Sequence, residues 1–260
     1  MKIVVCIKQV PDTTEVKLDP KTGTLIRDGV PSIINPDDKA GLEAALDLKD
    51  KYGATVTVIT MGPPQADKAL REALAMGVDR AILLTDRVFA GADTLATSTA
   101  LAAAIKKIDY DLVITGRQAI DGDTAQVGPQ IAEHLDIAQV SYVMQIEKDD
   151  NSLVLKRGFE DGYHMLQVEF PCLITTLSEL NNPRYMTVGG IIDAYRTKDV
   201  EIWNFENIDA DVSDMGLKGS PTKVKKSFTK GAKSAGKVYE LTPKESAKVI
   251  VEKLLEKYYI

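Results

Sequence analysis

The sequence contains few of the residues and patterns that mark secreted, membrane-spanning and metal-binding proteins. Its 260 residues include two cysteines, two histidines and one tryptophan. No apolar stretch approaches the roughly 20 residues that are needed to cross a bilayer. The N-terminal stretch MKIVVCIKQV is interrupted by Lys8 and Gln9, so it predicts a first strand rather than a signal peptide. Cys6 and Cys172 lie in separate apolar stretches, which favours reduced cysteines in a cytoplasmic protein.

Several motifs of common enzymes are also absent. There is no GxxxxGK[ST] phosphate loop, and no GxGxxG follows the first apolar stretch. These absences argue against P-loop nucleotidases and ordinary dinucleotide dehydrogenases. His134 and His164 lie on unrelated predicted elements, away from any nucleophile or ligand set, so both are interpreted as structural. Asp121 and Asp123 could begin a calcium loop, but Ala125 fills the next ligand position, so no metal site is predicted.

The composition indicates a globular, mildly acidic protein. Apolar residues make up 44% of the chain, which is enough for a large core, and the formal net charge is −6. At roughly 150 residues per domain, this length predicts one large domain, with or without an extension. The acidic balance disfavours a nucleic-acid or anionic-membrane partner. The lysines near the C-terminus are therefore interpreted as solvated side chains.

Strand and helix patterns alternate through the first half of the chain. Short apolar stretches with the lengths of buried strands lie at residues 2–7, 54–60, 81–85 and 112–114. Helical patterns follow them at residues 36–52, 65–76, 94–107 and 128–135. The alternation predicts an α/β fold with a doubly wound, mostly parallel sheet of the Rossmann-like, adenine-nucleotide-binding kind.

The connection between the first strand and the first helix is too long for a tight turn. Residues 21–24 (KTGT) within it are typical of a hairpin. Asn35 is the expected N-cap of the helix, and Pro36 is its first residue. Asp37 and Asp38 add acidic groups to the first turn. We therefore expect a small excursion followed by a helix with a well-defined start.

The pattern changes in the second half of the chain. Residues 139–176 predict two or three antiparallel strands, with turns at residues 149–152 and 160–162. From residue 181 onward little regular structure is expected, apart from a helix near residues 189–195. The sheet is therefore expected to carry an antiparallel extension.

The last part of the chain is predicted to be an arm. Residues 199–240 are polar and rich in turn residues, and they lead to an amphipathic helix at residues 244–258 with Thr242 as its N-cap. Such a long stretch without regular structure suggests a functional arm, and its terminal helix suggests a clasp around a partner subunit. We therefore expect a nucleotide-binding α/β domain with its antiparallel extension at residues 1–198 and a C-terminal arm at residues 199–260.

The loop from Gly116 to Val127 is the main candidate for a ligand site. It follows the apolar strand at residues 112–114 and precedes a helix. In open α/β sheets, loops at the carboxyl ends of strands hold nucleotides. Because the N–H groups of a helix start face anions, we expect this loop to hold the phosphates of an adenine nucleotide.

Pro129 limits where the next helix can begin. A proline in the second helical turn clashes with a preceding carbonyl, so the helix starts near Gly128 or its first turn is irregular. Either arrangement would leave the amides of Asp123–Val127 free to face a ligand. In the alternative interpretation, Asp121 and Asp123 only cap this helix.

Long motifs spread over the chain resemble one family. They are CIKQVPDTTEVKLDPKTGTLIRDGVPSIINPDDKAGLEAAL, VITMGPPQADKALREALAMGVDRAILL, GRQAIDGDTAQVGPQIAEHL and NNPRYMTVGGI. Over nearly its whole length the sequence resembles the electron transfer flavoprotein β-subunit. The resemblance implies a heterodimer with a larger, flavin-carrying α-subunit, which the C-terminal arm would embrace.

The resemblance also implies where a nucleotide binds. The matching positions lie at the end of the first strand, at the first helix start, at the exit of the second strand and in the Gly116 loop. They are Cys6, Asn35, Pro36, Asp37, Asp38, Thr60, Met61, Gly62, Gly116, Arg117, Gln118, Ala119, Ile120, Asp121, Gly122, Asp123, Thr124, Ala125, Gln126 and Val127.

A second surface is implied to dock on an acyl-CoA dehydrogenase. The matching residues are Asn182, Pro183, Arg184, Tyr185, Met186, Thr187, Val188, Gly189 and Gly190. In the family, the position of Val188 is the apolar anchor of this loop. Valine is a small side chain for that role, and the alternative interpretation is an exposed turn.

Two branches of the family differ in their nucleotide. Respiratory members hold AMP in the β-subunit as a structural ligand, whereas electron-bifurcating members hold a second FAD there. The stretches PDTTEVKLDP, GVPSIINPDD, FAGADTLATS and IDGDTAQVG are similar to the bifurcating branch. Asp93 and Thr94 would cap a helix whose start could hold a diphosphate, and Gly91 permits close backbone approach. Ala90, Gly91, Asp93, Thr94 and Thr97 are therefore added to the expected FAD site.

The resemblance thus implies the small subunit of a bifurcating electron transfer flavoprotein. NADH would reduce the bound FAD; one electron would pass to ferredoxin or flavodoxin, and the other through the α-subunit FAD to an acyl-CoA dehydrogenase. The redox chemistry belongs to the cofactor, and no catalytic side chain is expected. Two alternatives are a non-bifurcating β-subunit that holds AMP and a nucleotide-binding module of the stress-protein type.

Overall fold

The computed structural model of the protein describes residues 1–12, 31–222 and 236–259. The chain divides into two compact units, residues 1–224 and residues 225–260. The hairpin predicted at residues 21–24 lies outside the described residues.

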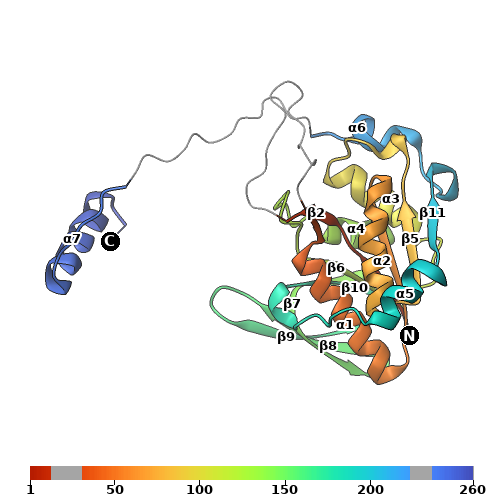
Figure 1. Ribbon diagram of the computed structural model, residues 1–260, viewed down its shortest axis with the longest axis horizontal. Helices are drawn as coiled ribbons and strands as arrows, with labels where there is room; N and C mark the ends of the chain where they lie inside the picture. The colour runs from red at the N-terminus through yellow and green to blue at the C-terminus, as the bar shows by residue number, and fades with distance from the viewer. Residues whose placement is uncertain (13–30, 223–235, 260) are drawn as a thin grey trace. The chain divides into compact units, whose positions relative to one another are not determined.

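The first unit is built on a twisted, mostly parallel sheet (Figure 1). In the described part of the chain, its nine strands follow the order β11-β5-β4-β1-β6-β10-β7-β8-β9. The strands that run parallel to one another are β1 (Lys2–Cys6), β4 (Thr55–Met61), β5 (Arg80–Leu84), β6 (Leu112–Gly116), β10 (Cys172–Thr176), β11 (Val200–Trp203) and β7 (Ala138–Asp149). β8 (Ser152–Gly158) and β9 (Tyr163–Glu169) continue the sheet beyond β7 in antiparallel order. The predicted α/β fold with an antiparallel extension is confirmed.

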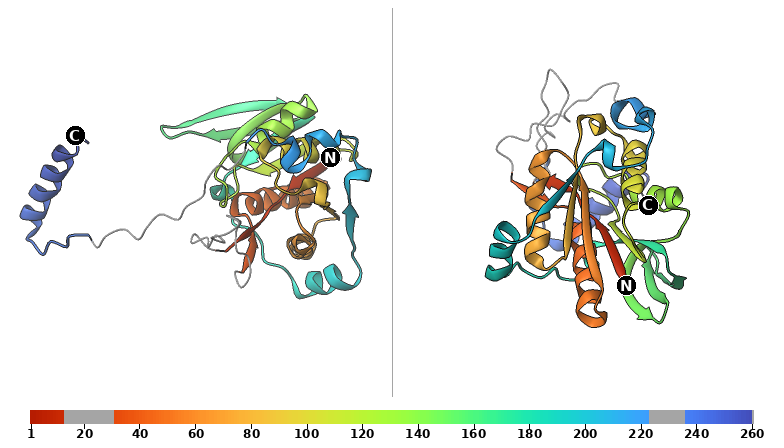
Figure 2. Two further views of the ribbon diagram at one scale, coloured as in Figure 1. Left: turned by 90° about the horizontal axis from the view of Figure 1, so that it is seen from above. Right: turned by 90° about the vertical axis from the view of Figure 1, so that its right-hand side faces the viewer.

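Helices cover both faces of this sheet, as the right-hand view of Figure 2 shows. One layer contains α1 (Pro36–Tyr52), α2 (Asp67–Met76) and α5 (Val188–Arg196), and the other contains α3 (Thr94–Ile105) and α4 (Val127–Leu135). Successive residues of β1 alternate between the two cores. Ile3 and Val5 pack with the α1 layer, whereas Val4 packs with the α3 layer. Because side chains of a strand point to opposite faces in turn, one apolar strand serves two cores.

Short elements complete the first unit. β2 (Gln9–Pro11) and β3 (Ser32–Ile34) form a separate antiparallel pair. The remaining helices are η1 (Pro64–Ala66), η2 (Arg87–Phe89), η3 (Ser178–Leu180), η4 (Phe205–Asn207), η5 (Val212–Asp214) and α6 (Gly216–Gly219).

The prediction that β10 belongs to the antiparallel extension is wrong. β10 lies between β6 and β7 and is parallel to both. All five of its residues are buried. A strand buried on both faces shows a continuous apolar run instead of alternation, which is typical of parallel strands inside an α/β sheet.

β11 is not predicted from the sequence. The two compact units of the chain divide after residue 224, whereas the predicted boundary follows residue 198. β11 extends the sheet beside β5, although its four residues are not fully buried. Arg80 secures it with two hydrogen bonds to Glu201, of 2.6 and 2.7 Å, and its guanidinium lies over the Trp203 ring. Side chains from the neighbouring strand therefore fix this short edge strand, which belongs to the first unit.

The second unit contains α7 (Pro243–Glu256), close to its predicted bounds. Glu245 accepts hydrogen bonds from the backbone N–H and the hydroxyl of Thr242, which fixes the start of the helix. Ile250, Val251 and Leu255 are exposed on its surface. No helix in the described ranges is long and apolar enough to span a membrane.

Candidate nucleotide site

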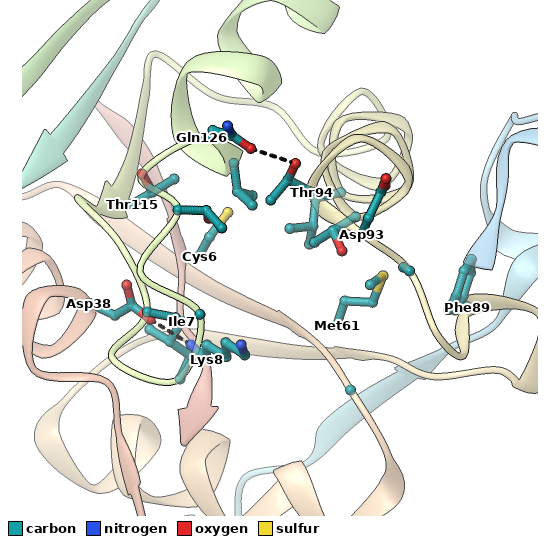
Figure 3. Close-up of a pocket in the computed structure, with 18 of the residues that line it drawn as sticks. Cys6, Ile7, Lys8, Asp38, Met61, Phe89, Asp93, Thr94, Thr115 and Gln126 are labelled. Carbon is teal, nitrogen blue, oxygen red and sulfur yellow. Dashed lines mark hydrogen bonds between the residues drawn. The ribbon is translucent and has the colours of Figure 1, made fainter. Parts of the chain in front are cut away.

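A cavity of about 910 Å³ lies at the carboxyl ends of β1, β4, β5 and β6 (Figure 3). Most of the residues that the sequence predicted for the site line it. They are Cys6, Asp38, Met61, Gly62, Ala90, Gly91, Asp93, Thr94, Thr97, Gly116, Arg117, Gln118, Ala119, Gly122, Thr124, Ala125, Gln126 and Val127. The topology therefore brings together the five separate segments that the sequence pointed to.

Some predicted residues do not line the cavity. They are Asn35, Pro36, Asp37, Thr60, Ile120, Asp121 and Asp123. Other residues do line it and were not predicted: Ile7, Lys8, Pro63, Pro64, Thr85, Asp86, Arg87, Phe89, Ala92, Leu101, Thr115 and Gly128. The group from Thr85 to Phe89 directly follows β5, and its place at the carboxyl edge of the sheet could have identified it.

Asn35 supports the Gly116 loop instead of capping α1 with its side chain. It stands at the N-cap position, but its side chain makes no capping hydrogen bond. Its Nδ2 donates to the carbonyl of Gln118 at 2.8 Å, and its Oδ1 accepts from the amide of Ile120 at 3.0 Å. Asn35 is fully buried, so both bonds are shielded from water. Its role is to fix the conformation of the neighbouring loop.

Asp38 joins two strand ends below the cavity. Its Oδ1 accepts from the amide of Gly116 at 3.0 Å, and its Oδ2 accepts from the amide of Lys8 at 2.7 Å. A Cβ at position 116 would lie 2.2 Å from Asp38 Oδ1, so glycine is required there. Burial raises the pKa of Asp38 to about 7, against the lowering effect of these hydrogen bonds. Burial, with a contribution from Asp38, also raises the pKa of the Cys6 thiol to about 12, so this cysteine stays protonated.

Asp37 and Asp121 hold other parts of the same loop through ionic contacts. Asp37 Oδ1 accepts from the amide of Ser178 at 3.0 Å, and its Oδ2 lies 3.3 Å from Arg117 Nε. That Nε makes no hydrogen bond, so this contact is electrostatic. Asp121 Oδ1 pairs with Lys8 Nζ at 2.6 Å. These carboxylates are used by the protein scaffold.

The start of α4 is the best anion site in the cavity. Ala125 has a φ of +52° and Gln126 a φ of −108°, a change of hand that turns successive N–H groups toward one concavity. Among the described residues, the amides of Ala125, Gln126 and Val127 have no hydrogen-bond partner. The first turn of α4 contains no acidic residue, and no side chain caps it. These amides can therefore receive a phosphate group.

Asp123 does not contribute a free amide, contrary to the prediction. Its N–H donates to the carbonyl of Ala119 at 2.9 Å, and its Oδ1 accepts from Gln118 Nε2 at 3.0 Å. Both groups are satisfied inside the loop because Asp123 closes a tight turn with a φ of +48°. The anion-binding stretch accordingly begins after this residue.

The start of α3 already holds a carboxylate. Asp93 caps this helix by accepting a hydrogen bond from the amide of Ala96 at 3.1 Å. Its negative charge opposes the second anion site that was predicted here. Thr94 instead donates from Oγ1 to Gln126 Oε1 at 2.9 Å, which joins the starts of α3 and α4 (Figure 3). The Thr94 hydroxyl is therefore already used as a donor, whereas Thr97, which also lines the cavity, can offer its hydroxyl to a ligand.

The predicted docking loop, from Asn182 to Gly190, lies outside the cavity. Tyr185 is 95% exposed and Val188 is 77% exposed, so apolar groups are available to a partner. Arg184 is not similarly available, because its guanidinium binds Glu43 at 2.9 to 3.0 Å. Thr187 caps α5 by accepting from the amide of Gly190 at 2.9 Å. The loop is thus anchored with its apolar residues outward.

Comparison with known proteins identifies the family. A model of the electron transfer flavoprotein domain matches residues 22–207. The chain belongs to the electron transfer flavoprotein family. It is 62% identical to the electron transfer flavoprotein subunit beta of Clostridium acetobutylicum, with all of both chains covered. The sequence resemblance is confirmed.

Two other relatives have names that refer to reductases. The caffeyl-CoA reductase-Etf complex subunit CarD of Acetobacterium woodii is 56% identical, with all of both chains covered. The acryloyl-CoA reductase electron transfer subunit gamma of Anaerotignum propionicum is 48% identical, also with all of both chains covered.

In the part of the chain that the structure describes, no group of three or more His, Cys, Asp or Glu side chains is placed to hold a metal.

Proposed function

We propose that this chain is the small subunit of an electron-bifurcating electron transfer flavoprotein and that its cavity holds FAD. The length of the cavity carries this proposal. It extends from the anion site at the start of α4 to Thr85–Phe89 and to Pro63 and Pro64, beyond β4 and β5. An adenosine monophosphate seated at α4 would leave that far end empty. A second anion site at α3 adds no support, because Asp93 holds a carboxylate there.

The residues present fit a flavin nucleotide. The amides of Ala125–Val127 would hold a phosphate group, and the hydroxyl of Thr97 would donate to a neighbouring oxygen. Met61 offers apolar surface to a ring system. FAD would supply the acceptor for a hydride, and the protein would supply its position and surroundings. The described side chains would thus bind and orient the cofactor rather than act as acid or base.

In the proposed reaction, NADH would be oxidised to NAD⁺ by giving a hydride to the bound FAD, and the proton of the hydride would be released later. One of its two electrons would go to ferredoxin or flavodoxin, and the other would go by way of the α-subunit FAD to an acyl-CoA dehydrogenase-type partner. The names of the Acetobacterium woodii and Anaerotignum propionicum relatives, which refer to CoA-thioester reductases, support this class of acceptor. The proposal places the complex in the cytoplasm.

Two surfaces would carry the protein partners. The exposed apolar residues Ile250, Val251 and Leu255 of α7 would bind the α-subunit. The loop from Asn182 to Gly190 would dock on the acyl-CoA dehydrogenase, with Val188 as its apolar anchor. Their exposure supports both assignments, because contiguous apolar groups on a surface mark interaction sites.

Nucleotide analysis of the purified heterodimer tests the proposed function. This chain is co-expressed with the α-subunit, and the heterodimer is purified. Its bound nucleotides are released by acid, and the amounts of FAD and AMP per heterodimer are measured. We expect two FAD and no AMP. One FAD plus one AMP would overturn bifurcation and support the AMP-holding alternative. A colourless homodimer that binds ATP would support the stress-type module, which the family match over residues 22–207 disfavours.

A further inference from the structure

One wall of the cavity is supported from outside by a distant part of the chain. The wall loop, residues 85–93, follows β5 and lines the cavity. The backing segment, residues 203–222, lies along the loop and does not line the cavity. The contact begins where the amide of Thr85 donates to the carbonyl of Trp203 at 2.8 Å. Residues assigned to the arm from sequence thus form part of the pocket's support.

The next contact fixes the middle of the wall loop. Asp86 accepts a hydrogen bond from the amide of Phe205 at 3.3 Å, and it also caps η2 through the amide of Val88 at 3.1 Å. The rings of Phe89 and Phe205 pack with their centroids 6.5 Å apart. Phe89 is buried, so this pair belongs to the core beneath the cavity.

The two backbones then come into close contact. The amide of Leu217 donates to the carbonyl of Ala90 at 2.9 Å. Gly216 has a φ of +55°, and a Cβ there would lie 2.1 Å from the carbonyl oxygen of Val88. Glycine is therefore required by both backbone angle and space.

The last contact reaches the start of α3. Ser220 is 3% exposed; its Oγ accepts from the amide of Asp93 at 2.8 Å and donates to the carbonyl of Gly216 at 2.7 Å. The amide of Thr222 donates to Asp93 Oδ2 at 3.0 Å, while Asp93 Oδ1 caps α3 through Ala96. Although desolvation opposes it, these hydrogen bonds from Thr222 and Ala96 lower the pKa of Asp93. One charged carboxylate thus holds both the cavity helix and the end of the backing segment.

We propose that the backing segment is a positioning element of the nucleotide pocket, in which Ser220 and Thr222 hold Asp93 and transmit nucleotide binding to residues 215–222. This inference rests on the proposed nucleotide site. A nucleotide that fixes Asp93 and Thr94 also fixes the partners of Asp93. By linkage, whatever stabilises the backing segment then strengthens nucleotide binding by the same factor.

Hydrogen exchange on the purified heterodimer tests this coupling. Amide exchange is measured with the small-subunit nucleotide removed and again after addition of FAD or AMP as the probe. In the natural sequence we expect the nucleotide to slow exchange at residues 124–127 and also at residues 215–222, which do not line the cavity. In Ser220→Ala the slowing remains at residues 124–127 and is reduced at residues 215–222, where only the contacts of Leu217 and Thr222 with the wall loop remain. FAD affinity, from flavin fluorescence, is expected to weaken about fivefold.

Control variants separate positioning from general stability. Ser213→Ala removes an exposed hydroxyl from the same segment and is expected to behave as the natural protein. Ser220→Thr keeps the hydroxyl and is expected to restore the coupling. Asp93→Asn keeps an N-cap oxygen but loses an acceptor for Thr222, so it provides a second test if Ser220→Ala does not fold.

The outcomes distinguish this inference from the proposed function. Equal slowing at residues 215–222 in Ser220→Ala and the natural protein would overturn the coupling, and so would no slowing there in the natural protein. With either result, slower exchange at residues 124–127 would still support the proposed nucleotide site. Absence of slowing at residues 124–127 as well would instead overturn the proposed site.

Discussion

Single polar residues at this site serve the loop conformation more than they serve a ligand. Asn35 and Asp38 are both buried, and together they accept or donate hydrogen bonds to four backbone groups around the cavity. Buried polar atoms require partners, and a lost partner costs about 1–3 kcal/mol. The local sequence could not reveal these roles, because the partners of Asn35 lie more than 80 residues away. The helix-start pattern correctly predicts that Asn35 stands at the N-cap position of α1, but its side chain binds the Gly116 loop and does not cap the helix.

A substitution that preserves capping separates the two roles of Asn35. Serine caps helices about as well as asparagine, but it is too short to reach Gln118 and Ile120. We therefore expect Asn35→Ser to lower FAD affinity at least about tenfold, as Asn35→Ala does, because either change leaves two buried backbone groups unpaired. Flavin fluorescence of the purified heterodimer measures the affinity. Normal binding by the serine variant, with weak binding by the alanine variant, would show that capping is what matters.

At the scale of elements, the helix starts around the cavity differ in charge. The start of α3 carries the Asp93 carboxylate, whereas the start of α4 has no acidic residue and its amides lack partners among the described residues. Both helices point their positive ends at the same cavity. The difference in capping is the reason why we propose α4, and not α3, as the phosphate site.

A matched pair of variants at Gln126 tests this selection. Gln126→Asp adds a carboxylate at the N-cap of α4, and Gln126→Asn has the same shape without the charge. Both remove the contact with Thr94. We expect the aspartate variant to bind AMP about tenfold more weakly than the asparagine variant at low salt, with a smaller difference at high salt. Isothermal titration of the nucleotide-free heterodimer measures both. Equal AMP affinities of the two variants would show that the phosphate does not bind at the start of α4.

The sequence predicts those strands and helices whose buried residues follow the spacing of a strand or a helix. The residues of β1, β4, β5 and β6 are almost all buried and form short strand-like stretches, and helix start and stop residues mark the segments between them, so the parallel core was predictable. β11 was not, because its four residues at the sheet edge show no strong pattern and depend on Arg80. Its place is set by backbone pairing with β5, supported by an ion pair between residues 121 positions apart. Short edge elements of this kind need tertiary information.

At the scale of the whole molecule, the first unit extends to residue 224 and includes the backing segment. From the sequence this segment is predicted to belong to the arm, because it is polar and has no regular helix or strand pattern. A segment without regular secondary structure can still be fixed by hydrogen bonds to another loop. Here Ser220 accepts from the amide of Asp93, and the amide of Leu217 donates to the carbonyl of Ala90. Of the predicted arm, only residues 225–260 belong to the second unit.

The second unit contains the apolar surface that would hold the α-subunit. Ile250 is 59% exposed on α7, so a charge there leaves the helix intact and disrupts only a contact that buries the residue. We expect Ile250→Glu to abolish co-purification with the α-subunit. Lys248→Glu adds an acidic residue to the same helix and serves as the control, and we expect it to retain the complex. Far-ultraviolet circular dichroism would verify that both variants are folded. If Ile250→Glu retains the α-subunit as well as Lys248→Glu does, the partner binds elsewhere, because burying an unpaired carboxylate in an apolar contact costs several kcal/mol.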